Sequence, residues 1–180
     1  MSWAVDDSWT LFLDRDGVIN KRIMSGYVTS IEEFEFLADV PETIAAFSKV
    51  FRYVFVVTNQ QGVGKGLMTE SNLVELHRYM EQKIEEMNGS ITRTYYAPGV
   101  VSPDNYLRKP KPGMALLAQR QYKGVDFERS IMVGDTDSDM LFGKNLGMKT
   151  VRIASPEEKI GVEADVTVDR LVDFLTWLEI

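Results

Sequence analysis

Three short runs of the chain, at 9–13, 53–57 and 130–133, are almost wholly apolar and rich in strand-forming residues. Runs without alternation of polar and apolar residues are typical of strands buried on both faces, as in a parallel sheet. Between these runs the apolar residues recur at helical spacing. Since parallel strands need crossover connections, this alternation predicts an α/β fold with helices on both faces of a mostly parallel central sheet.

We therefore expect a Rossmann-like three-layer sandwich that forms a single domain over residues 1–180. The glycine-rich stretch 60–68 is expected to be a loop, and Thr69 is expected to cap the helix that follows. The expected strands are 9–13, 34–37, 53–57, 91–96, 130–133, 150–153 and an edge strand at 166–168. The expected helices begin near Pro41, follow Thr69, span 113–122, pass through 140–146, and span 171–178 with Asp169 as the cap.

Two carboxylates, Asp14 and Asp16, follow directly on the first apolar run. Because side chains alternate along extended backbone, these two are expected to point one way and Arg15 the other. Two like charges in close proximity are costly unless a cation or a proton lies between them. The pattern therefore suggests a nucleophile bound to Mg²⁺ beside an acid that transfers a proton.

Four polar segments fall at the carboxyl ends of expected strands, where open α/β sheets bind their ligands. Each segment alone has an ordinary explanation, as a turn, a helix cap or an extended linker. Their occurrence together, in this order, favours one shared site. The segments are Asp14–Gly17, Thr58–Asn59, Arg108–Pro112 and Gly134–Asp139.

The formal net charge of −7 argues against a nucleic-acid groove, which needs clustered lysine and arginine. Basic residues nevertheless flank the four segments, and a small anionic substrate suits this arrangement better than surface scatter does. The chain has no cysteine, which excludes disulfides and thiolate-bound metals. It shows no signal-peptide core and no apolar stretch that could span a bilayer, so we expect a cytoplasmic protein without membrane partners. The flanking residues are Lys21, Arg22, Lys65, Arg108, Lys109 and Lys111.

Together the four segments resemble the four motifs of the haloacid dehalogenase-like (HAD) superfamily. Longer stretches are similar to the histidinol-phosphate phosphatase and D-glycero-D-manno-heptose-1,7-bisphosphate phosphatase family, and the similarity runs from about Leu11 to Ile153. The resemblance implies a Mg²⁺-dependent phosphomonoesterase that forms an aspartyl-phosphate and acts on a small phosphorylated metabolite. The stretches that carry it are 16–20, 26–28, 58–66 and 108–114.

By this resemblance Asp14 is the nucleophile, and Asp16 protonates the leaving oxygen and then deprotonates water. The role of Asp16 needs a raised pKa, which burial and neighbouring carboxylates are expected to supply. Thr58 and the backbone of Asn59 are expected to bind phosphoryl oxygens, and Lys109 to bridge nucleophile and phosphate. Substrate contacts are also expected from Arg108, Lys65, Gly26 and Tyr27, and Mg²⁺ contacts from Asp14, the Asp16 carbonyl, Asp135 and Asp139.

The loop at 97–107 departs from the family, since many members carry a Cys/His zinc site there. It contains neither residue type, so no zinc is expected and the exact substrate stays open. The intervals from Asp16 to Thr58 and from Thr58 to Lys109 are filled by the expected elements and leave no room for a separate lid. We therefore expect a capless site shaped by the loops 21–30, 60–68 and 97–107.

The favoured substrate is D-glycero-D-manno-heptose 1,7-bisphosphate, followed by histidinol phosphate. A polynucleotide 3′-phosphatase is a third candidate, which the acidic balance disfavours. A non-catalytic phosphate-binding module is the alternative from another class, although none of the expected catalytic residues is missing. The stretch 62–66 lacks the spacing of a phosphate-binding P-loop, and the single histidine, His77, is expected to be structural or solvent-facing. We expect a monomer or a small homo-oligomer.

Overall fold

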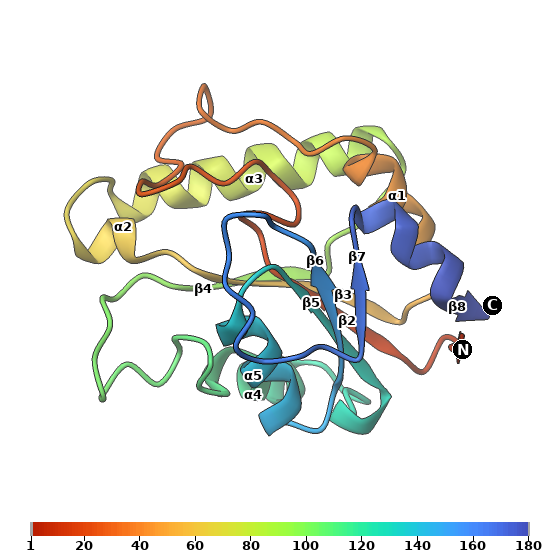
Figure 1. Cartoon of the computed structure of the whole chain (residues 1–180). Coiled ribbons are helices and arrows are strands. Elements are labelled where there is room, and N and C mark those ends of the chain that lie inside the picture. The colour runs from red at the N-terminus through yellow and green to blue at the C-terminus, as the bar shows by residue number, and fades with distance from the viewer. Residues whose placement is uncertain (1, 180) are drawn as a thin grey trace.

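The computed structural model describes residues 2–179 and confirms the α/β fold (Figure 1). The strands of its main sheet are β2 (Thr10–Leu13), β3 (Tyr53–Asn59), β4 (Arg93–Ala97), β5 (Ser130–Gly134), β6 (Lys149–Ile153) and β7 (Val166–Val168). Their order is β4-β3-β2-β5-β6-β7, and every neighbouring pair runs parallel. The predicted edge position of β7 is therefore confirmed.

Strand β2 lies in the middle of the sheet, and all four of its residues are buried. Leu11 and Leu13 pack into one apolar cluster, while Phe12 packs into another on the opposite face. This double burial explains why the strand is continuously apolar. Leu13 pairs with Val56 of β3 and with Val133 of β5, so the carboxyl ends of three strands meet at one edge.

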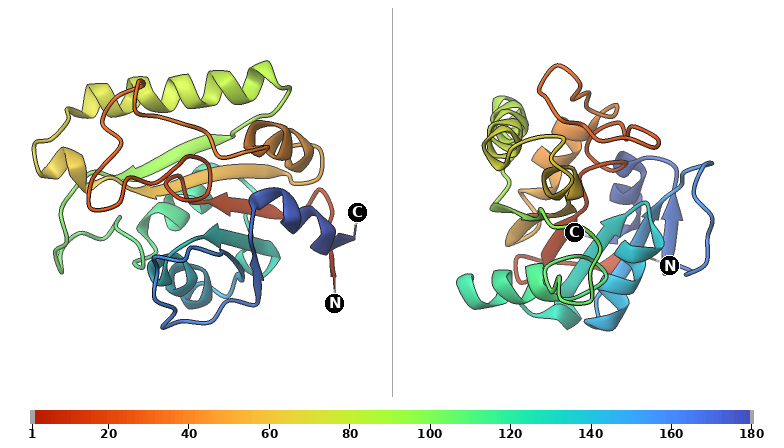
Figure 2. Two further views of the ribbon diagram at one scale, coloured as in Figure 1. Left: turned by 45° about the horizontal axis from the view of Figure 1, so that its top comes forward. Right: turned by 90° about the vertical axis from the view of Figure 1, so that its left-hand side faces the viewer.

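Helices cover both faces of the sheet, as Figures 1 and 2 show. The helices are α1 (Val40–Phe47), α2 (Gln61–Gly64), α3 (Glu70–Glu86), α4 (Gly113–Gln121), α5 (Asp137–Asn145) and the 3₁₀ helices η1 (Phe127–Arg129) and η2 (Leu171–Trp177). Buried residues of α1, α3 and η2 join the cluster of Leu11, and those of α4 and α5 join the cluster of Phe12. In the described part of the chain, no helix combines the length and apolarity needed to cross a bilayer.

The two ends of the described chain lie side by side (Figure 1), which the sequence analysis did not predict. Strand β1 (Trp3–Ala4) pairs in parallel with β8 (Leu178–Glu179) as a second, two-stranded sheet. Phe174 of η2 is fully buried, with its ring centroid 5.9 Å from that of Trp3 and 5.7 Å from that of Phe47. This packing attaches the C-terminal segment to the body of the same chain.

Two predicted elements differ in type. The last helix is a 3₁₀ helix whose N-cap is Arg170, not Asp169, because the Asp173 carboxylate accepts the backbone N–H of Arg170 at 3.0 Å. The stretch 60–68 is not all loop, because α2 forms a single helical turn within it. The other predicted helices and the capping role of Thr69 are confirmed.

The predicted short strand at 34–37 is wrong: only Phe36 makes a β-bridge, to Asn20. The backbone there bonds across to the loop at 19–21 and does not reach the sheet. The connection from β2 to β3 therefore holds one helix, α1, and the connection from β3 to α4 holds α2, α3 and β4. Within residues 2–179 neither connection contains a separate folded lid, as the sequence predicted.

We expect Thr69→Ala to lower the free energy of unfolding by about 1 kcal/mol. The Thr69 hydroxyl accepts the backbone N–H of Asn72 at 3.1 Å, and the Asn72 side chain accepts the backbone N–H of Thr69 at 3.2 Å. Alanine leaves that first N–H group without its partner. Urea denaturation measures the loss, and Thr69→Ser, which keeps the hydroxyl, is the matched control. An equal loss in both variants would contradict the capping role.

Candidate active site

A pocket of about 400 Å³ opens at the carboxyl ends of β2, β3 and β5. Every residue that the sequence assigned to the site lines it, so the structure brings the distant segments together as predicted. Their individual chemical roles stay predictions. These lining residues are Asp14, Asp16, Gly26, Tyr27, Thr58, Asn59, Lys65, Arg108, Lys109, Asp135 and Asp139.

Asp14 lies one residue past β2 and meets a buried lysine. The Lys109 Nζ atom lies 2.8 Å from Asp14 Oδ1 and 2.7 Å from Asp139 Oδ1. Burial raises the pKa of Asp14 to about 6, against the attraction of Lys109 and with the repulsion of Asp139. Burial alone would lower the pKa of Lys109, but the two carboxylates outweigh it and raise that pKa. Lys109 is therefore a fixed positive charge in the pocket floor.

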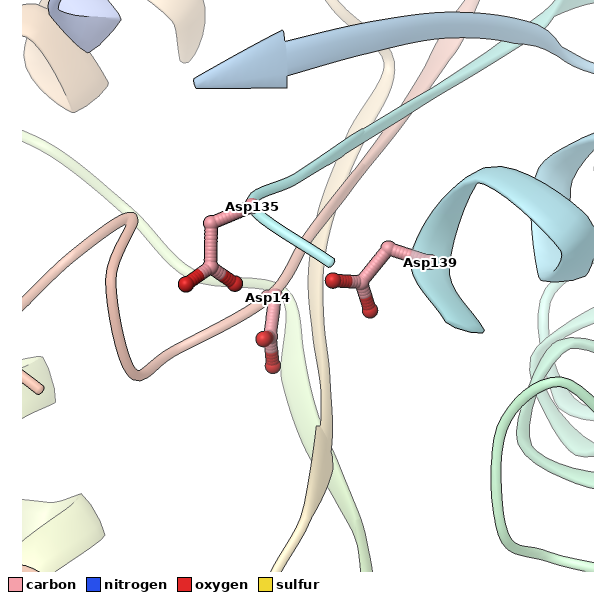
Figure 3. Close-up of side chains that lie close together, drawn as sticks. All are labelled: Asp14, Asp135 and Asp139. Atoms are coloured by element: carbon pink, nitrogen blue, oxygen red, sulfur yellow. The ribbon is translucent and has the colours of Figure 1, made fainter. Parts of the chain in front are cut away.

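The carboxylates of Asp14, Asp135 and Asp139, here called the acidic triad, converge in Figure 3. One oxygen of each lies within 4.8 Å of the others. Burial, together with the charges of Asp14 and Asp139, raises the pKa of Asp135 to about 8. Asp135 Oδ1 is buried and has no hydrogen-bond partner among the described residues. Converging oxygens with one acceptor unused fit a hard divalent cation, which prefers carboxylate ligands.

Two glycines let the triad pack this closely against the backbone. A Cβ atom at Gly17, whose φ is +88°, would lie 2.2 Å from Asp135 Oδ2. A Cβ atom at Gly134 would lie 2.2 Å from the Cβ of Asp139. The peptide between Asp16 and Gly17 therefore lies against Asp135, which suits the expected role of the Asp16 carbonyl beside a metal.

Asp16 differs from the prediction in its neighbours and in its acidity. The strand ends at Leu13, so strict alternation stops there and Arg15 turns toward Asp16, with Nη2 3.0 Å from Oδ1. Asn20 donates to the same oxygen at 3.0 Å, and Gln60 donates to the other at 2.8 Å. Burial alone would raise the pKa of Asp16, but Arg15, Asn20 and Gln60 outweigh it and hold that pKa below its usual range. The expected raised pKa is therefore wrong for the free site.

The end of β3 positions the lysine. Asn59 Oδ1 accepts the backbone N–H of Lys109 at 2.9 Å, and Asn59 Nδ2 donates to the Lys109 carbonyl at 3.2 Å. Gln60 Nε2 also donates to the Thr58 hydroxyl at 2.8 Å, which leaves the hydroxyl proton of Thr58 free to donate. Gln60 was not among the predicted site residues, although it directly follows the polar end of a predicted strand, which was a usable signal.

Two cations of the pocket lining, Lys65 and Arg108, are less buried than Lys109, and we call them the cationic rim. The Tyr27 hydroxyl accepts from Lys65 Nζ and from Gln61 Nε2, both at 2.7 Å. Arg108 Nη1 is buried and has no hydrogen-bond partner among residues 2–179. Burial lowers the pKa of Arg108, against the opposite effect of Tyr27. Neither rim cation forms an ion pair with a carboxylate of the described chain.

Arg22 lies in the pocket although the sequence analysis gave it no role there. Its Nη1 atom lies 3.2 Å from Asp135 Oδ2 and 2.6 Å from Glu158 Oε1. It therefore links the loop after β2 to Asp135, which follows β5, and to the loop after β6. Its position among the basic residues that flank the motifs was the available signal.

The loop at 97–107 is ordered by hydrogen bonds, and its sequence holds no cysteine or histidine. Lys111 Nζ donates to the carbonyl of Ser102 at 3.1 Å. Asn105 Nδ2 donates to the carbonyl of Val100 at 3.0 Å. An ammonium group and an amide thus hold the loop that precedes Arg108.

This fold and site define a hydrolase of the HAD superfamily. A family model described as HAD-hydrolase-like matches residues 106–174. The crystal structure of D,D-heptose 1.7-bisphosphate phosphatase from B. bronchiseptica, complexed with magnesium and phosphate, superposes with a TM-score of 0.81. It is 25% identical in sequence, and the match covers 91% of this chain and 94% of that one.

Comparison of sequences narrows the class further. The D-glycero-alpha-D-manno-heptose-1,7-bisphosphate 7-phosphatase of Campylobacter jejuni is 37% identical over 151 residues, 84% of this chain and 85% of the relative. The D-glycero-beta-D-manno-heptose-1,7-bisphosphate 7-phosphatase of Vibrio cholerae is 34% identical over 174 residues, 91% and 92% of the two chains. The chain belongs to the heptose-1,7-bisphosphate phosphatase family, and it is a phosphatase.

The acidic triad predicts that the metal-free protein loses stability as the pH rises from 6.5 to about 8. In this window folded Asp135 keeps a proton, whereas an unfolded aspartate is ionised, so the free energy of unfolding falls with pH. One group contributes at most about 1.4 kcal/mol per pH unit. His77, with a pKa of about 3 in the folded chain against a usual 6.5, has the opposite effect, which is largely complete at the start of this window and ends within its first pH unit.

Urea denaturation in EDTA at both ends of this pH window measures the decline. Saturating Mg²⁺ should remove it, because a cation offsets the charge of the ionised carboxylates. Asp135→Asn should remove it without metal, and Asp104→Asn, at an exposed aspartate, should leave it unchanged. Metal-free stability that is constant or rises across the window would contradict the prediction.

Proposed function

We propose that this phosphatase hydrolyses the 7-phosphate of D-glycero-D-manno-heptose 1,7-bisphosphate. The observation that carries the proposal is that the pocket is lined both by the buried acidic triad with Lys109 and by two less buried cations, Lys65 and Arg108, that have no carboxylate partner among residues 2–179. A sugar bisphosphate can place one phosphate beside Lys109 and the acidic triad and the other beside the cationic rim. The names of the relatives support this substrate, and both the alpha and the beta anomer occur among them.

Asp14 is the proposed nucleophile, held 2.8 Å from Lys109 Nζ. One of its oxygens attacks phosphorus, the bond from phosphorus to the sugar oxygen breaks, and an aspartyl-phosphate forms. A water molecule then attacks the same phosphorus. The bond to Asp14 breaks, inorganic phosphate leaves, and the free carboxylate is restored.

Asp16 is the proposed acid and base. Its low pKa in the free site means that it must gain a proton before it can act as an acid. A phosphate dianion beside it raises its pKa, as any nearby negative charge does, so substrate binding favours the protonated form. Asp16 then gives its proton to the leaving sugar oxygen and takes one from the attacking water.

The remaining groups of the pocket floor are proposed to stabilise the transferred phosphoryl group. Lys109 and the Thr58 hydroxyl place positive charge and a donated proton where negative charge develops. The Asn59 backbone N–H is the proposed third donor. The side chain of Asn59 holds the Lys109 backbone at both its N–H and its carbonyl, so the lysine enters the reaction already positioned.

The proposed ligands of Mg²⁺ are Asp14, the Asp16 backbone carbonyl and Asp135, with Asp139 orienting them. The fit rests on the converging oxygens of the triad and on the unpartnered Oδ1 of Asp135. When bound, Mg²⁺ supplies positive charge that offsets the carboxylates and the phosphate. We propose no zinc site, since the loop at 97–107 offers no thiolate or imidazole.

Charge argues against the other candidates. The ammonium group of histidinol phosphate would face Lys65 and Arg108. A polynucleotide end needs an extended basic surface, whereas the chain carries a net charge of −7. A binding module has no need of a buried carboxylate held against an ammonium group.

We further propose that the protein works in the cytoplasm as one domain, in a monomer or a small homo-oligomer. A doubly phosphorylated sugar does not cross a membrane unaided, so its phosphatase must act where the sugar is made.

The direct test follows hydrolysis by phosphorus-31 NMR with Mg²⁺ and, in separate samples, each heptose bisphosphate anomer and histidinol phosphate. Loss of the 7-phosphate signal with the 1-phosphate intact supports the proposal. Faster release from histidinol phosphate would replace the heptose assignment. No release from any ester, p-nitrophenyl phosphate included, would favour the binding module.

Asp14→Asn should lower kcat by about 10³-fold or more while the fold is retained. The amide is a poor nucleophile, but it has nearly the same shape as the carboxylate. Initial rates with p-nitrophenyl phosphate and circular dichroism give the two measurements, and Asp104→Asn is the control at an exposed aspartate. Turnover at the parent rate in Asp14→Asn would refute the nucleophile assignment.

Lys65→Met should lower kcat/KM for the bisphosphate by about 10–100-fold, the effect of losing one charge-assisted hydrogen bond. The kcat/KM for p-nitrophenyl phosphate should stay within about twofold of the parent value, because this ester has no second phosphate that could contact the cationic rim. Lys144→Met, at an exposed lysine outside the pocket, is the control. An equal loss with both esters would show that Lys65 does not bind the second phosphate.

A further inference from the structure

The single histidine of the chain, His77, is buried in α3 and does not line the pocket. His77 is 4% exposed, and its ring centroid lies 5.6 Å from that of Tyr96. Its Nε2 atom lies 3.1 Å from Nη1 of Arg15, which is fully buried. The hydrolysis described above does not use this buried imidazole.

The chemistry of the contact fixes the state of the imidazole. Arginine has only donors, so His77 Nε2 must accept with its lone pair and the ring proton must lie on Nδ1. A protonated ring would present a donor and a second positive charge to Arg15. Burial and the charge of Arg15 lower the pKa of His77 to about 3, which agrees with a neutral ring.

The other end of the same guanidinium reaches the active site. Arg15 Nη2 lies 3.0 Å from Asp16 Oδ1, so one planar group joins His77 to Asp16. The remaining nitrogen of the guanidinium, Nε, is buried and has no hydrogen-bond partner among the described residues. His77 therefore supplies the one side-chain acceptor, besides Asp16, that orients Arg15 among residues 2–179.

We propose that His77 is a positioning residue that acts through Arg15 to hold Asp16 in the orientation needed for proton transfer to the leaving oxygen. The proposal rests on the role of Asp16 in the proposed function. Without the acceptor at Nε2 the guanidinium can rotate, and Asp16 keeps only its bonds from Asn20 and Gln60. Misplacement of an acid by a fraction of an ångström slows proton transfer without weakening substrate binding.

The leaving group separates positioning from a merely structural role. A sugar oxygen is strongly basic and needs the proton of Asp16 as it departs, whereas p-nitrophenolate is weakly basic and does not. The ratio kcat/KM reports the steps up to departure of the leaving group. Loss of Asp16 alignment should therefore lower kcat/KM for the sugar phosphate more than for the aryl phosphate, while a general loss of folded enzyme lowers both equally.

The experiment compares three variants with the parent on both esters. His77→Phe keeps a ring against Tyr96 but removes the acceptor, and His77→Gln restores an acceptor near the position of Nε2. Met80→Ala, at a buried neighbour on α3 that forms no hydrogen bond to Arg15, is the control for lost packing. Thermal unfolding and metal titration of each variant accompany the kinetics.

His77→Phe should lower kcat/KM for the heptose bisphosphate about tenfold and for p-nitrophenyl phosphate less than about threefold, within the range of an outer hydrogen-bond partner. His77→Gln should recover most of the loss. Met80→Ala should lower thermal stability and leave the ratio of the two kcat/KM values at the parent value. A parent-like ratio in His77→Phe, or no recovery in His77→Gln, would overturn the proposal.

Nitrogen-15 NMR of the parent gives a second test that needs neither turnover nor a folded variant. The single imidazole should show a protonated Nδ1 and an unprotonated Nε2, and a proton on Nε2 would overturn the proposal. If the parent hydrolyses no ester, the proposed function itself fails. If the parent turns over and the variants do not distinguish the esters, only the role of His77 fails.

Discussion

Lys109 holds two buried carboxylates together, and the rest of the site depends on that contact. Removing a carboxylate from water costs several kcal/mol unless a partner offsets its charge. Lys109 Nζ lies 2.8 Å from Asp14 and 2.7 Å from Asp139, so each shares one ammonium group. Asp135 pairs with Arg22 at 3.2 Å, but burial and the charges of Asp14 and Asp139 outweigh that contact and raise its pKa to about 8. If all three carboxylates were ionised, their negative charge would exceed what Lys109 and Arg22 offset, so the metal-free site keeps a proton that a metal ion can replace.

The backbone carries this arrangement at little conformational cost. Parallel strands end at the same edge of the sheet, so three chain segments deliver polar groups to one place with no long loop between sheet and site. Gly17 and Gly134 allow the aspartates to pack against main chain where any side chain would collide. Asn59 then ties Lys109 to the end of β3 through two hydrogen bonds. Side chains on rigid elements are held more accurately than side chains on free loops.

The sequence predicted the features that depend on local residue pattern. It did not predict the features that depend on contacts between residues far apart in the chain. Continuous apolar runs predicted the strands, and polar residues after them predicted the pocket. The acidity of Asp16 could not be read in the same way, because it depends on Arg15 turning back. That turn is stabilised by His77, which lies far along the chain on α3. The pairing of β1 with β8 is likewise non-local, since neither two-residue strand has a signal of its own.

A pocket without a cap domain depends for its selectivity on the residues and loops that line it. Here the lining has an acidic part, the triad, and a basic part, the cationic rim. Acids lie at the floor, where they repel any phosphate until positive charge offsets them. Lys65 and Arg108, the cationic rim, have no carboxylate partners in the described chain, and the proposed function assigns them the second phosphate. A substrate with phosphates at both ends satisfies the two regions together, whereas a monophosphate held by the rim leaves the floor empty. Under the proposed function, the distance between two like-charged groups on one substrate is thus the property for which this site is selective.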